Sequence, residues 1–326
     1  MRIDGELLHG DAELHFFESD WDAHGHGKDP AFDNVILHIL VFPPKPRKSP
    51  TRWAIEHSLL FIDLLRQGLE SYAEEEVLGA LADGETTALE ESLLILPLEK
   101  RYEKLLKAAR SRWLGKVEYA RKRLEILSWE EACHQTAMEI LGYRYNRAVM
   151  LFLAGDYSLA AIRSGSHNVE DVYGAGKGKW KLSGSRPANH PNIRLGQYFE
   201  WVHARPNWPE NLVSWGNEFQ RAENLAPATY SRKSLQLGSR KRNLAKHVLA
   251  NTVGGTRIEN LVCDGFLPFL AARSGDDYFM PWYHWFPGDV PSALKQLFRR
   301  LGEESSAMGP HSNGAYQGLV GCLLEK

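Results

Sequence analysis

Acidic residues and histidines alternate near the start of the chain, at a spacing that can bind a divalent metal ion. Residues 10–17 read Gly-Asp-Ala-Glu-Leu-His-Phe-Phe, so polar and apolar side chains alternate with the period of a β-strand that has one buried face. Asp11, Glu13 and His15 are expected on one face, with neighbours about 6–7 Å apart. Two carboxylates and an imidazole at that spacing can share one cation.

A polar segment with two more histidines follows this strand. Residues 19–27 are broken by two glycines, which predicts a loop, and the segment contains Asp20, His24 and His26. Asp20 is a further candidate metal ligand. Two imidazoles one residue apart can contribute to a transition-metal site, or they can simply be exposed on a surface loop.

The next apolar run predicts a second strand. Residues 34–42 (NVILHILVF) are rich in branched side chains, as in a strand that is buried on both faces, and His38 lies in the middle. Asp29-Pro30 before it is a typical start of a short helical turn, with Asp29 as the cap. His38 can be a metal ligand or a hydrogen-bonded core histidine, and the polar face with Glu13 can be a site or solvent-exposed surface.

The joint order of these motifs resembles the bacterial domain-of-unknown-function 2851 family. The matching residues are Gly10, Asp11, Glu13 and His15; Ser19, Asp20 and Trp21; His24, Gly25, His26 and Asp29; and Asn34, Val35, Ile36, Leu37 and His38. Further matches downstream extend the resemblance over most of the chain. The family implies no settled activity.

A looser resemblance is to nucleases of the PD-(D/E)xK type, whose acids hold Mg²⁺ or Mn²⁺ and whose central strand carries E-x-K or, in some members, E-x-H. Glu13-Leu14-His15 fits E-x-H. The resemblance implies that Glu13 holds the metal, with Asp11 or Asp20 as its partner. It also implies that His15 orients or activates the attacking water.

One acid of the nuclease pattern has no counterpart in the chain. Fuller members of the resembled family carry a Gly-Pro-Asp-Phe segment upstream, and this sequence lacks it. Residues 1–8 predict the end of a hairpin, with Asp4-Gly5 as its turn, so the chain is expected to begin inside its own domain. Either the start codon is assigned too late, or a metal ligand has been lost and catalysis with it.

Composition is that of an ordinary globular protein. The 326 residues have a formal net charge of −2. This argues against a uniformly basic surface that binds nucleic acid, but it is compatible with a local basic patch. The three cysteines are scattered without a CxxC pair, which favours a reduced, cytoplasmic compartment. Neither a signal peptide nor a membrane-spanning apolar run is found.

The rest of the chain predicts helices behind a proline-rich linker. Four prolines in residues 43–50 mark the expected domain boundary. Helical spacing or capping patterns predict helices within residues 53–72, 87–97, 98–123, 128–142, 148–154, 197–201 and 315–324. Asn146 is expected to cap the helix at 148–154. Residues 98–123 carry ten Lys and Arg against three Glu, which form either an ordinary basic face or a ridge that contacts phosphate.

Two downstream segments are candidates for phosphate binding. Residues 164–192 predict a Gly/Lys-rich loop, which can be a phosphate cradle that includes Lys179, a lid or a mobile surface loop. Residues 186–194 resemble the family's R-P-x-N-x-P-x-x-R stretch. Its Arg186 and Arg194 suit phosphate recognition, although internal pairing with acids is the structural alternative.

Together these features predict an α+β protein. A small mixed α/β unit at residues 1–50 is expected to be docked on a mainly helical body at residues 51–326. The leading functional hypothesis is a nuclease or phosphodiesterase that depends on Mg²⁺ or Mn²⁺ and acts on nucleic acid.

Two other hypotheses stay open. One is a non-catalytic module that binds nucleic acid or protein, and the other is a hydrolase with a transition metal at His24, His26 and His38. The nuclease hypothesis requires Glu13 and His15 to face a basic groove. The histidine-metal hypothesis requires imidazole nitrogens that converge within a few ångströms.

Overall fold

The protein forms two compact units, Met1–Val77 and Leu78–Lys326. The computed structural model describes residues 2–3, 6–15, 18, 20–40, 58–60, 88–183, 186–219, 228–301 and 312–324. The predicted linker at 43–50 lies outside the described residues. Of the predicted helix at 53–72 only residues 58–60 are described, and they form a strand that pairs with another strand, so the helix prediction is wrong there. Among the described helices, none combines the length and the apolar character needed to cross a membrane.

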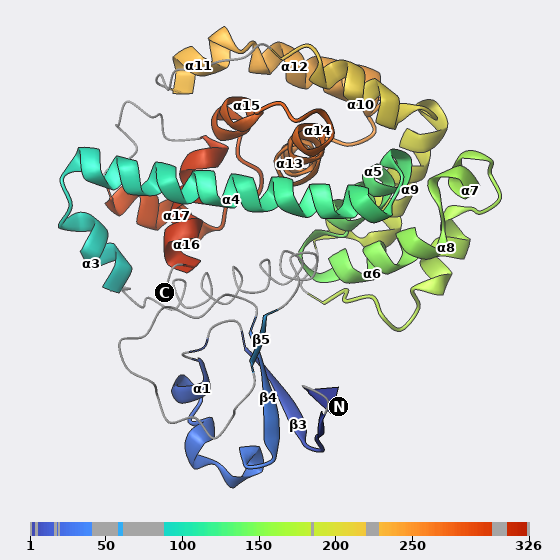
Figure 1. Ribbon diagram of the computed structural model, residues 1–326. Helices are drawn as coiled ribbons and strands as arrows, with labels where there is room; N and C mark the ends of the chain where they lie inside the picture. Colours follow the sequence, from blue (N-terminus) through green and yellow to red (C-terminus); the bar gives the residue numbers. More distant parts are fainter. Residues whose placement is uncertain are drawn as a thin grey trace. The chain divides into compact units, whose positions relative to one another are not determined.

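The N-terminal unit contains two small sheets. Its elements are β1 (Arg2–Ile3), β2 (Glu6–Leu7), β3 (Asp11–His15), α1 (Asp20–Ala23), the 3-10 turns η1 (His26–Lys28) and η2 (Pro30–Phe32), β4 (Val35–Leu40) and β5 (Ser58–Leu60). Strands β1 and β2 pair antiparallel, as expected of a hairpin. Strands β3, β4 and β5 lie side by side in that order and are parallel to one another (Figure 1).

Local signals explain most of these elements. Asp29 caps η2 as predicted, because its Oδ1 accepts a hydrogen bond of 2.9 Å from the backbone N–H of Ala31, and Pro30 occupies the first position. Strand β4 is buried on both faces, as its branched residues predict. Strand β3 also forms where expected, but Leu14 on its apolar face is 46% exposed, whereas His15 on its polar face is 5% exposed.

The second unit is helical. It contains α3 (Ala88–Leu94), α4 (Leu98–Ile126), α5 (Trp129–Leu141), α6 (Tyr143–Asp156), α7 (Leu159–Arg163), α8 (Val169–Ala175), η3 (Pro187–Asn189), α9 (Pro191–Ala204), α10 (Trp208–Gly216), α11 (Ala228–Ser234), α12 (Leu237–Asn243), the π-helical η4 (Leu244–Val248), α13 (Thr256–Asn260), the π-helical η5 (Leu261–Phe266), α14 (Leu267–Ser274), α15 (Phe279–His284), α16 (Ser292–Arg300) and α17 (Asn313–Leu324). Helix α4 is the long helix across the front of this unit in Figure 1, and α14, α15 and α17 pack against it.

Aromatic side chains fill the core of the helical unit. The tryptophans with almost no exposed surface are Trp113, Trp201, Trp208, Trp282 and Trp285. Their indole N–H groups find backbone partners where the core allows, as between Trp201 and the Val248 carbonyl at 2.7 Å. The aromatic residues within 279–286 also pack in or against this core. The small sheets of the first unit and the helices of the second confirm the α+β class, with helices dominating the described residues.

Two predictions within the helical unit are also wrong. Asn146 lies inside α6 rather than at its start, and its buried side chain pairs with the backbone of Lys181 through hydrogen bonds of 2.9 and 3.0 Å. The segment at 164–192 contains α8, because Asn168 and Asp171 form a reciprocal capping box that begins a helix among the glycines.

Candidate metal centre

The parallel pairing of β3 with β4 brings polar side chains from both strands together. In this register Glu13 lies opposite His38. Gly10 permits the close approach at the start of β3, because a Cβ there would lie 2.6 Å from the carbonyl oxygen of Asn34. The backbone N–H of Asp11 donates to that same oxygen at 2.8 Å. Gly10 is therefore needed for the strand pairing that positions the site.

Four imidazoles and one carboxylate form a cluster inside the N-terminal unit. His15 is at its centre, with Nδ1 2.8 Å from Nε2 of His38 and Nε2 3.1 Å from Nε2 of His26. The Oε1 atom of Glu13 lies 3.7 Å from Nε2 of His15 and 3.8 Å from Nε2 of His26. Nitrogen atoms of His15, His24 and His26 all lie within 4.8 Å of one another. Imidazole nitrogens therefore converge, but the third histidine of this group is His15 and not His38, which the histidine-metal hypothesis named.

The turn between α1 and η1 directs two of these histidines toward His15. Gly25 has a φ of 73°, in the left-handed region that glycine adopts without strain. This conformation holds the rings of His24 and His26 with centroids 5.4 Å apart, and both rings lie about as close to the ring of His15. His24 is exposed and His15 is buried, so the cluster reaches from solvent into the unit.

Aromatic side chains enclose the inner side of the cluster. Trp21 packs with Val35 and Phe32 as a small hydrophobic core. The ring of Trp21 lies 5.3 Å from that of His38, and the ring of Phe32 lies 3.7 Å from that of His26. These contacts limit the movement of the imidazoles and exclude water from the inner face.

Burial keeps the inner histidines neutral. It lowers the pKa of His15, partly offset by the carboxylate of Glu13. Burial, reinforced by the neighbouring His15, lowers the pKa of His38 to about 4. Neutral imidazole is the form that binds metal ions, so these groups are ready to bind without losing a proton at neutral pH.

A comparison with known protein families assigns the chain to a family. A family model described as "Protein of unknown function (DUF2851)" matches residues 1–174, which is more than half of the chain. The chain belongs to the DUF2851 family. No curated protein matches it, and no solved structure does. The matched residues include the whole histidine cluster of this DUF2851 member.

The other metal ligands expected from the sequence have different surroundings. Asp11 is exposed, and its Oδ2 accepts a hydrogen bond of 3.0 Å from Nδ2 of Asn34. A register shift between Asp11 and Ala12 separates it from the regular part of β3, so Asp11 lies outside the cluster. Asp20, the first residue of α1, is close enough for its charge to raise the pKa values of His15 and His38.

The residues expected to bind phosphate belong to the helical unit and differ in burial. Arg186 is exposed at the start of η3. Lys179 is also exposed, and its Nζ lies 4.1 Å above the ring of Phe152. Arg194 is only 7% exposed and is therefore the most constrained of the three.

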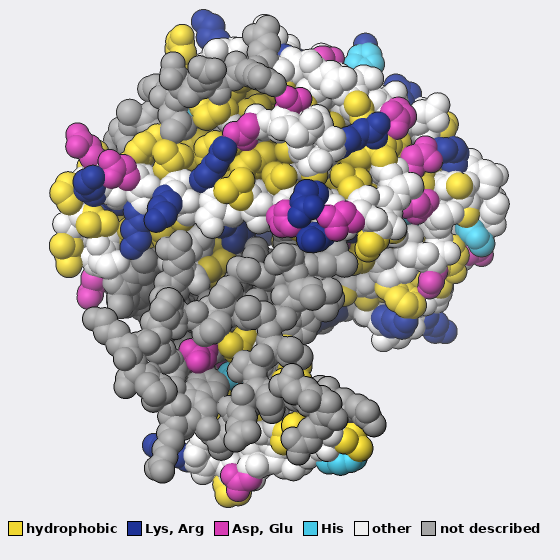
Figure 2. All heavy atoms as spheres, viewed as in Figure 1, with side chains coloured by type: hydrophobic (Ala, Val, Ile, Leu, Met, Phe, Trp, Pro, Cys, Tyr) yellow, Lys and Arg dark blue, Asp and Glu magenta, His cyan; other side chains and the backbone are white. Residues whose placement is uncertain are grey.

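The basic residues of α4 do not form a continuous basic surface. Several are paired with acids, among them Arg110 with Asp277 and Lys116 with Asp264. On the face drawn in Figure 2, Lys and Arg side chains are interspersed with hydrophobic and acidic ones. These contacts favour the structural interpretation of this helix over a phosphate-contacting ridge.

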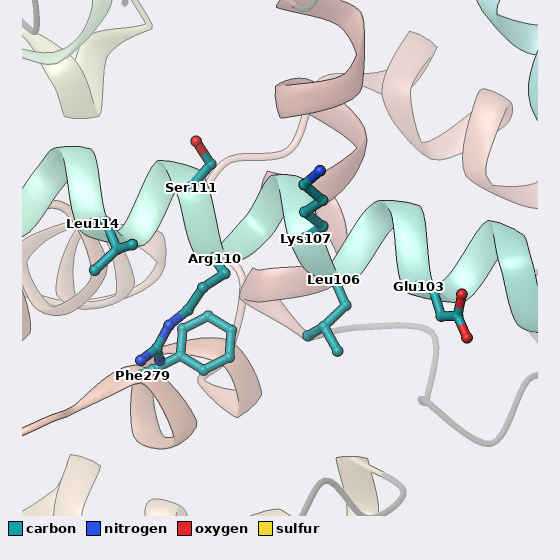
Figure 3. A pocket seen from close by; sticks show the side chains of 7 residues that line it. All are labelled: Glu103, Leu106, Lys107, Arg110, Ser111, Leu114 and Phe279. Carbon is teal, nitrogen blue, oxygen red and sulfur yellow. The ribbon is translucent and has the colours of Figure 1, made fainter.

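A shallow pocket on α4 offers no comparable set of chemical groups. It is lined by Glu103, Leu106, Lys107, Arg110, Ser111, Leu114 and Phe279. Its polar side chains spread along the helix and do not converge (Figure 3), and Arg110 stacks over the ring of Phe279 at 4.4 Å. The histidine cluster is therefore the stronger candidate for a site.

Proposed function

We propose that this DUF2851 member is a metal-dependent hydrolase whose metal ion is bound by His15, His24 and His26. The observation that supports this best is the separation of 3.1 Å between Nε2 of His15 and Nε2 of His26. In a tetrahedral zinc site with metal–nitrogen bonds of about 2.0–2.1 Å, two ligand nitrogens lie about 3.3 Å apart. A small adjustment of the side chains therefore accommodates the ion.

The ligand set favours a transition metal of the zinc type. Three imidazoles suit Zn²⁺, Co²⁺ or Ni²⁺, and Mn²⁺ binds such a set more weakly, whereas Mg²⁺ prefers oxygen ligands and retains its waters. Of the two ions that the nuclease resemblance implies, Mn²⁺ fits better. Three protein ligands also leave one coordination position open, as in catalytic zinc sites.

His38 acts on the metal site through His15. If Nε2 of His15 binds the metal, its single proton is on Nδ1, which then donates the 2.8 Å hydrogen bond to Nε2 of His38. The depressed pKa of His38 keeps its ring neutral, and in the tautomer with the proton on Nδ1 its Nε2 accepts this bond. His38 is thus a positioning residue that selects the tautomer of His15.

Glu13 is placed to act as a general base. Its Oε1 is 3.7 and 3.8 Å from the two Nε2 atoms, somewhat farther than a fourth ligand of a tetrahedral site would lie. Its side chain is 31% exposed, so the carboxylate meets both the cluster and solvent. We assign it the role of general base: with a metal ion held by the three histidines, its carboxylate would accept the proton of the water that attacks the ester phosphorus, and the ester oxygen would leave as the alcohol.

The substrate class remains as the sequence suggested, with a phosphodiester as the first candidate. Acidic residues outnumber Lys and Arg among the described residues of the N-terminal unit. The metal ion would therefore supply the positive charge that draws a phosphate to this unit. A nucleic acid is one such substrate and a small phosphodiester is another.

Metal binding and catalysis can be tested separately on the full chain. After treatment with a chelator, the protein is titrated with Co²⁺, whose visible absorption reports nitrogen ligands and tetrahedral geometry. His26→Ala is expected to lose this spectrum, whereas Glu13→Gln retains it. His9→Ala is the matched control, because His9 is exposed and outside the cluster.

Hydrolysis is then measured with Zn²⁺, Mn²⁺, Mg²⁺ or chelator on labelled DNA and RNA and on a chromogenic phosphodiester. Glu13→Gln is expected to lower the rate at least a hundredfold. A full chain that binds no Co²⁺, or a His26→Ala variant with an unchanged spectrum, would overturn the metal centre. Metal binding without turnover of any substrate would instead support the non-catalytic interaction module.

A further inference from the structure

Three arginines from different helices meet in the helical unit. Helices α6, α9 and α13 all pack against α5. Arg257 of α13 contacts the ring of Tyr143, which lies one helical turn before Arg147 on α6, and Arg194 of α9 is near enough for its charge to act on Arg257. This arginine cluster belongs to the helical unit and is independent of the metal centre.

Arg194 is buried without a counterion. Its guanidinium donates to Oε1 of Gln197 at 2.8 Å and to Oδ1 of Asn189 at 2.6 Å, both of which are neutral amides. Its Nε is buried and has no hydrogen-bond partner. Among the residues that the structure describes, no carboxylate pairs with it, and burial lowers its pKa. A buried charge held only by neutral groups is unfavourable until an anion balances it.

Arg257 adds a second buried positive charge. It is 3% exposed, and its guanidinium lies 4.4 Å from the ring centre of Tyr143. It pairs with Asp289, whose side chain is 40% exposed. Burial, followed by repulsion from Arg194, lowers its pKa to about 10. Because Asp289 is partly exposed, its pairing with Arg257 does not cancel the repulsion between Arg194 and Arg257.

The nearby carboxylates are already shared. Glu139 accepts from Arg147 at 2.8 Å and from Arg123 at 3.3 Å. Asp264 accepts from Lys116 at 2.9 Å. Positive groups therefore exceed negative ones around the three arginines.

The backbone beside the cluster is strained. Tyr143 has a φ of 56°, which is unfavourable for a residue with a Cβ. This conformation starts α6 directly after α5 and accompanies the contact between the Tyr143 ring and Arg257. Strain that the surrounding structure maintains is frequent at binding sites.

We propose that Arg147, Arg194 and Arg257 form an anion site that binds a terminal phosphate group, as in inorganic phosphate or a phosphate monoester. Arginine forks match the geometry of phosphate oxygens. Arg194 and Arg257 are buried, whereas Tyr143, Asn189 and Gln197, which contact them, are half-buried, so the cluster lies just beneath the surface. A terminal phosphate suits arginines this buried because it carries at most one ester substituent, whereas a phosphodiester within a nucleic acid carries two.

The test measures binding of inorganic phosphate to the full chain in the presence of a chelator, at an ionic strength held constant with NaCl. Calorimetry is expected to show saturable binding, and phosphate is expected to raise the unfolding temperature. Arg194→Met should weaken binding at least tenfold. Arg194→Lys, which retains the charge without the fork, should give an intermediate affinity and serves if the Met variant does not fold.

Arg121→Met is the matched control, because Arg121 is on the surface of α4 and already pairs with Glu118 and Glu125. Its affinity for phosphate should equal that of the wild type. A 5′-phosphorylated oligonucleotide should compete with phosphate, and the same oligonucleotide with a 5′-hydroxyl should not.

Three results would overturn the proposal. They are the absence of saturable phosphate binding, an unchanged affinity in both Arg194 variants, and equal competition by the two oligonucleotides. The chelator makes the outcome independent of the metal centre, so either proposal can fail without the other.

Discussion

The histidine cluster and the arginine cluster respond to burial in opposite ways. Burial favours the neutral form of a base, and histidine can adopt that form near neutral pH, as the lowered pKa of His38 shows. Arginine stays charged even when burial lowers its pKa, as at Arg257. The first cluster therefore offers lone pairs to a cation, whereas the second offers positive charge to an anion.

The two clusters also differ in what supports them. Around the histidines, Trp21 and Val35 form a small described cluster with Phe32 against them, and Leu37 and Leu40 of β4 are also buried. The arginines are embedded in a unit whose core is continuous and rich in aromatic residues. The first site should therefore depend on its ligand for rigidity, and the second should be rigid without one.

The largest effect is expected from the core of the helical unit. Trp201→Ala should lower the free energy of unfolding of this unit by about 3–5 kcal/mol, because the buried indole packs against Trp208 and donates to the Val248 carbonyl. Urea unfolding followed by circular dichroism measures this change. Hydrogen exchange in β3 and β4 should be unaffected, and Trp201→Phe should cost less. A similar loss of protection in those strands would mean that the N-terminal unit depends on this core.

Lowering the pH should destabilise the helical unit through its buried His134, whereas its arginines stay charged throughout. His134 is fully buried; its Nδ1 accepts from the Tyr198 hydroxyl at 2.6 Å, and its Nε2 donates to the Tyr157 carbonyl at 2.9 Å. Burial lowers its folded-state pKa to about 4, so its contribution is complete above an unfolded pKa of about 6.5 and falls as the pH drops toward 4. Between pH 7 and pH 5 the loss should be about 2 kcal/mol.

Urea unfolding of the wild type and of His134→Gln at both pH values measures this contribution. The variant should lack that part of the pH dependence, whatever its stability at pH 7. An identical pH dependence in both proteins would show that His134 does not carry it.

A bound metal ion should stabilise the N-terminal unit alone. Zn²⁺ at about 100 times its dissociation constant adds about 2.7 kcal/mol to the folded state that binds it. Hydrogen exchange should slow in β3 and β4 and remain unchanged in the helical unit. His26→Ala should abolish the slowing and His9→Ala should preserve it. Equal slowing in both units would contradict the proposed difference in rigidity.

The smallest effects come from one substitution made in each unit. Gly25→Ala should destabilise the N-terminal unit by about 1 kcal/mol, because alanine is strained at a φ of 73°. Gly155→Ala, inside α6 with open space around it, should stabilise the helical unit by about 0.5–1 kcal/mol. Hydrogen exchange and urea unfolding report the two changes, and opposite signs are expected. A neutral Gly25→Ala with unchanged metal affinity would mean that the turn does not position His24 and His26.

Local patterns were sufficient where neighbours in sequence make the decisive contacts. The branched run of β4, the Asp29 cap and the cap of α5, where Ser128 accepts from the N–H of Glu131, all form as their residues predict. The short helix α8 was predicted as a loop. Glycines surround it, and its capping box consists of only two residues, Asn168 and Asp171. Asn146 was misassigned because its partner Lys181 is 35 residues away.

By itself, the sequence determined strands β3 and β4, several of the helices, the family, and the supply of acids and histidines from which a site is built. Only the tertiary structure decided which of them meet. The pairing of β3 with β4 places Glu13 beside His38, the turn at Gly25 brings His24 and His26 to His15, and a register shift leaves Asp11 outside. The physical reason is that strand register and turn geometry depend on hydrogen bonds and packing between residues distant in sequence, which a local pattern does not contain.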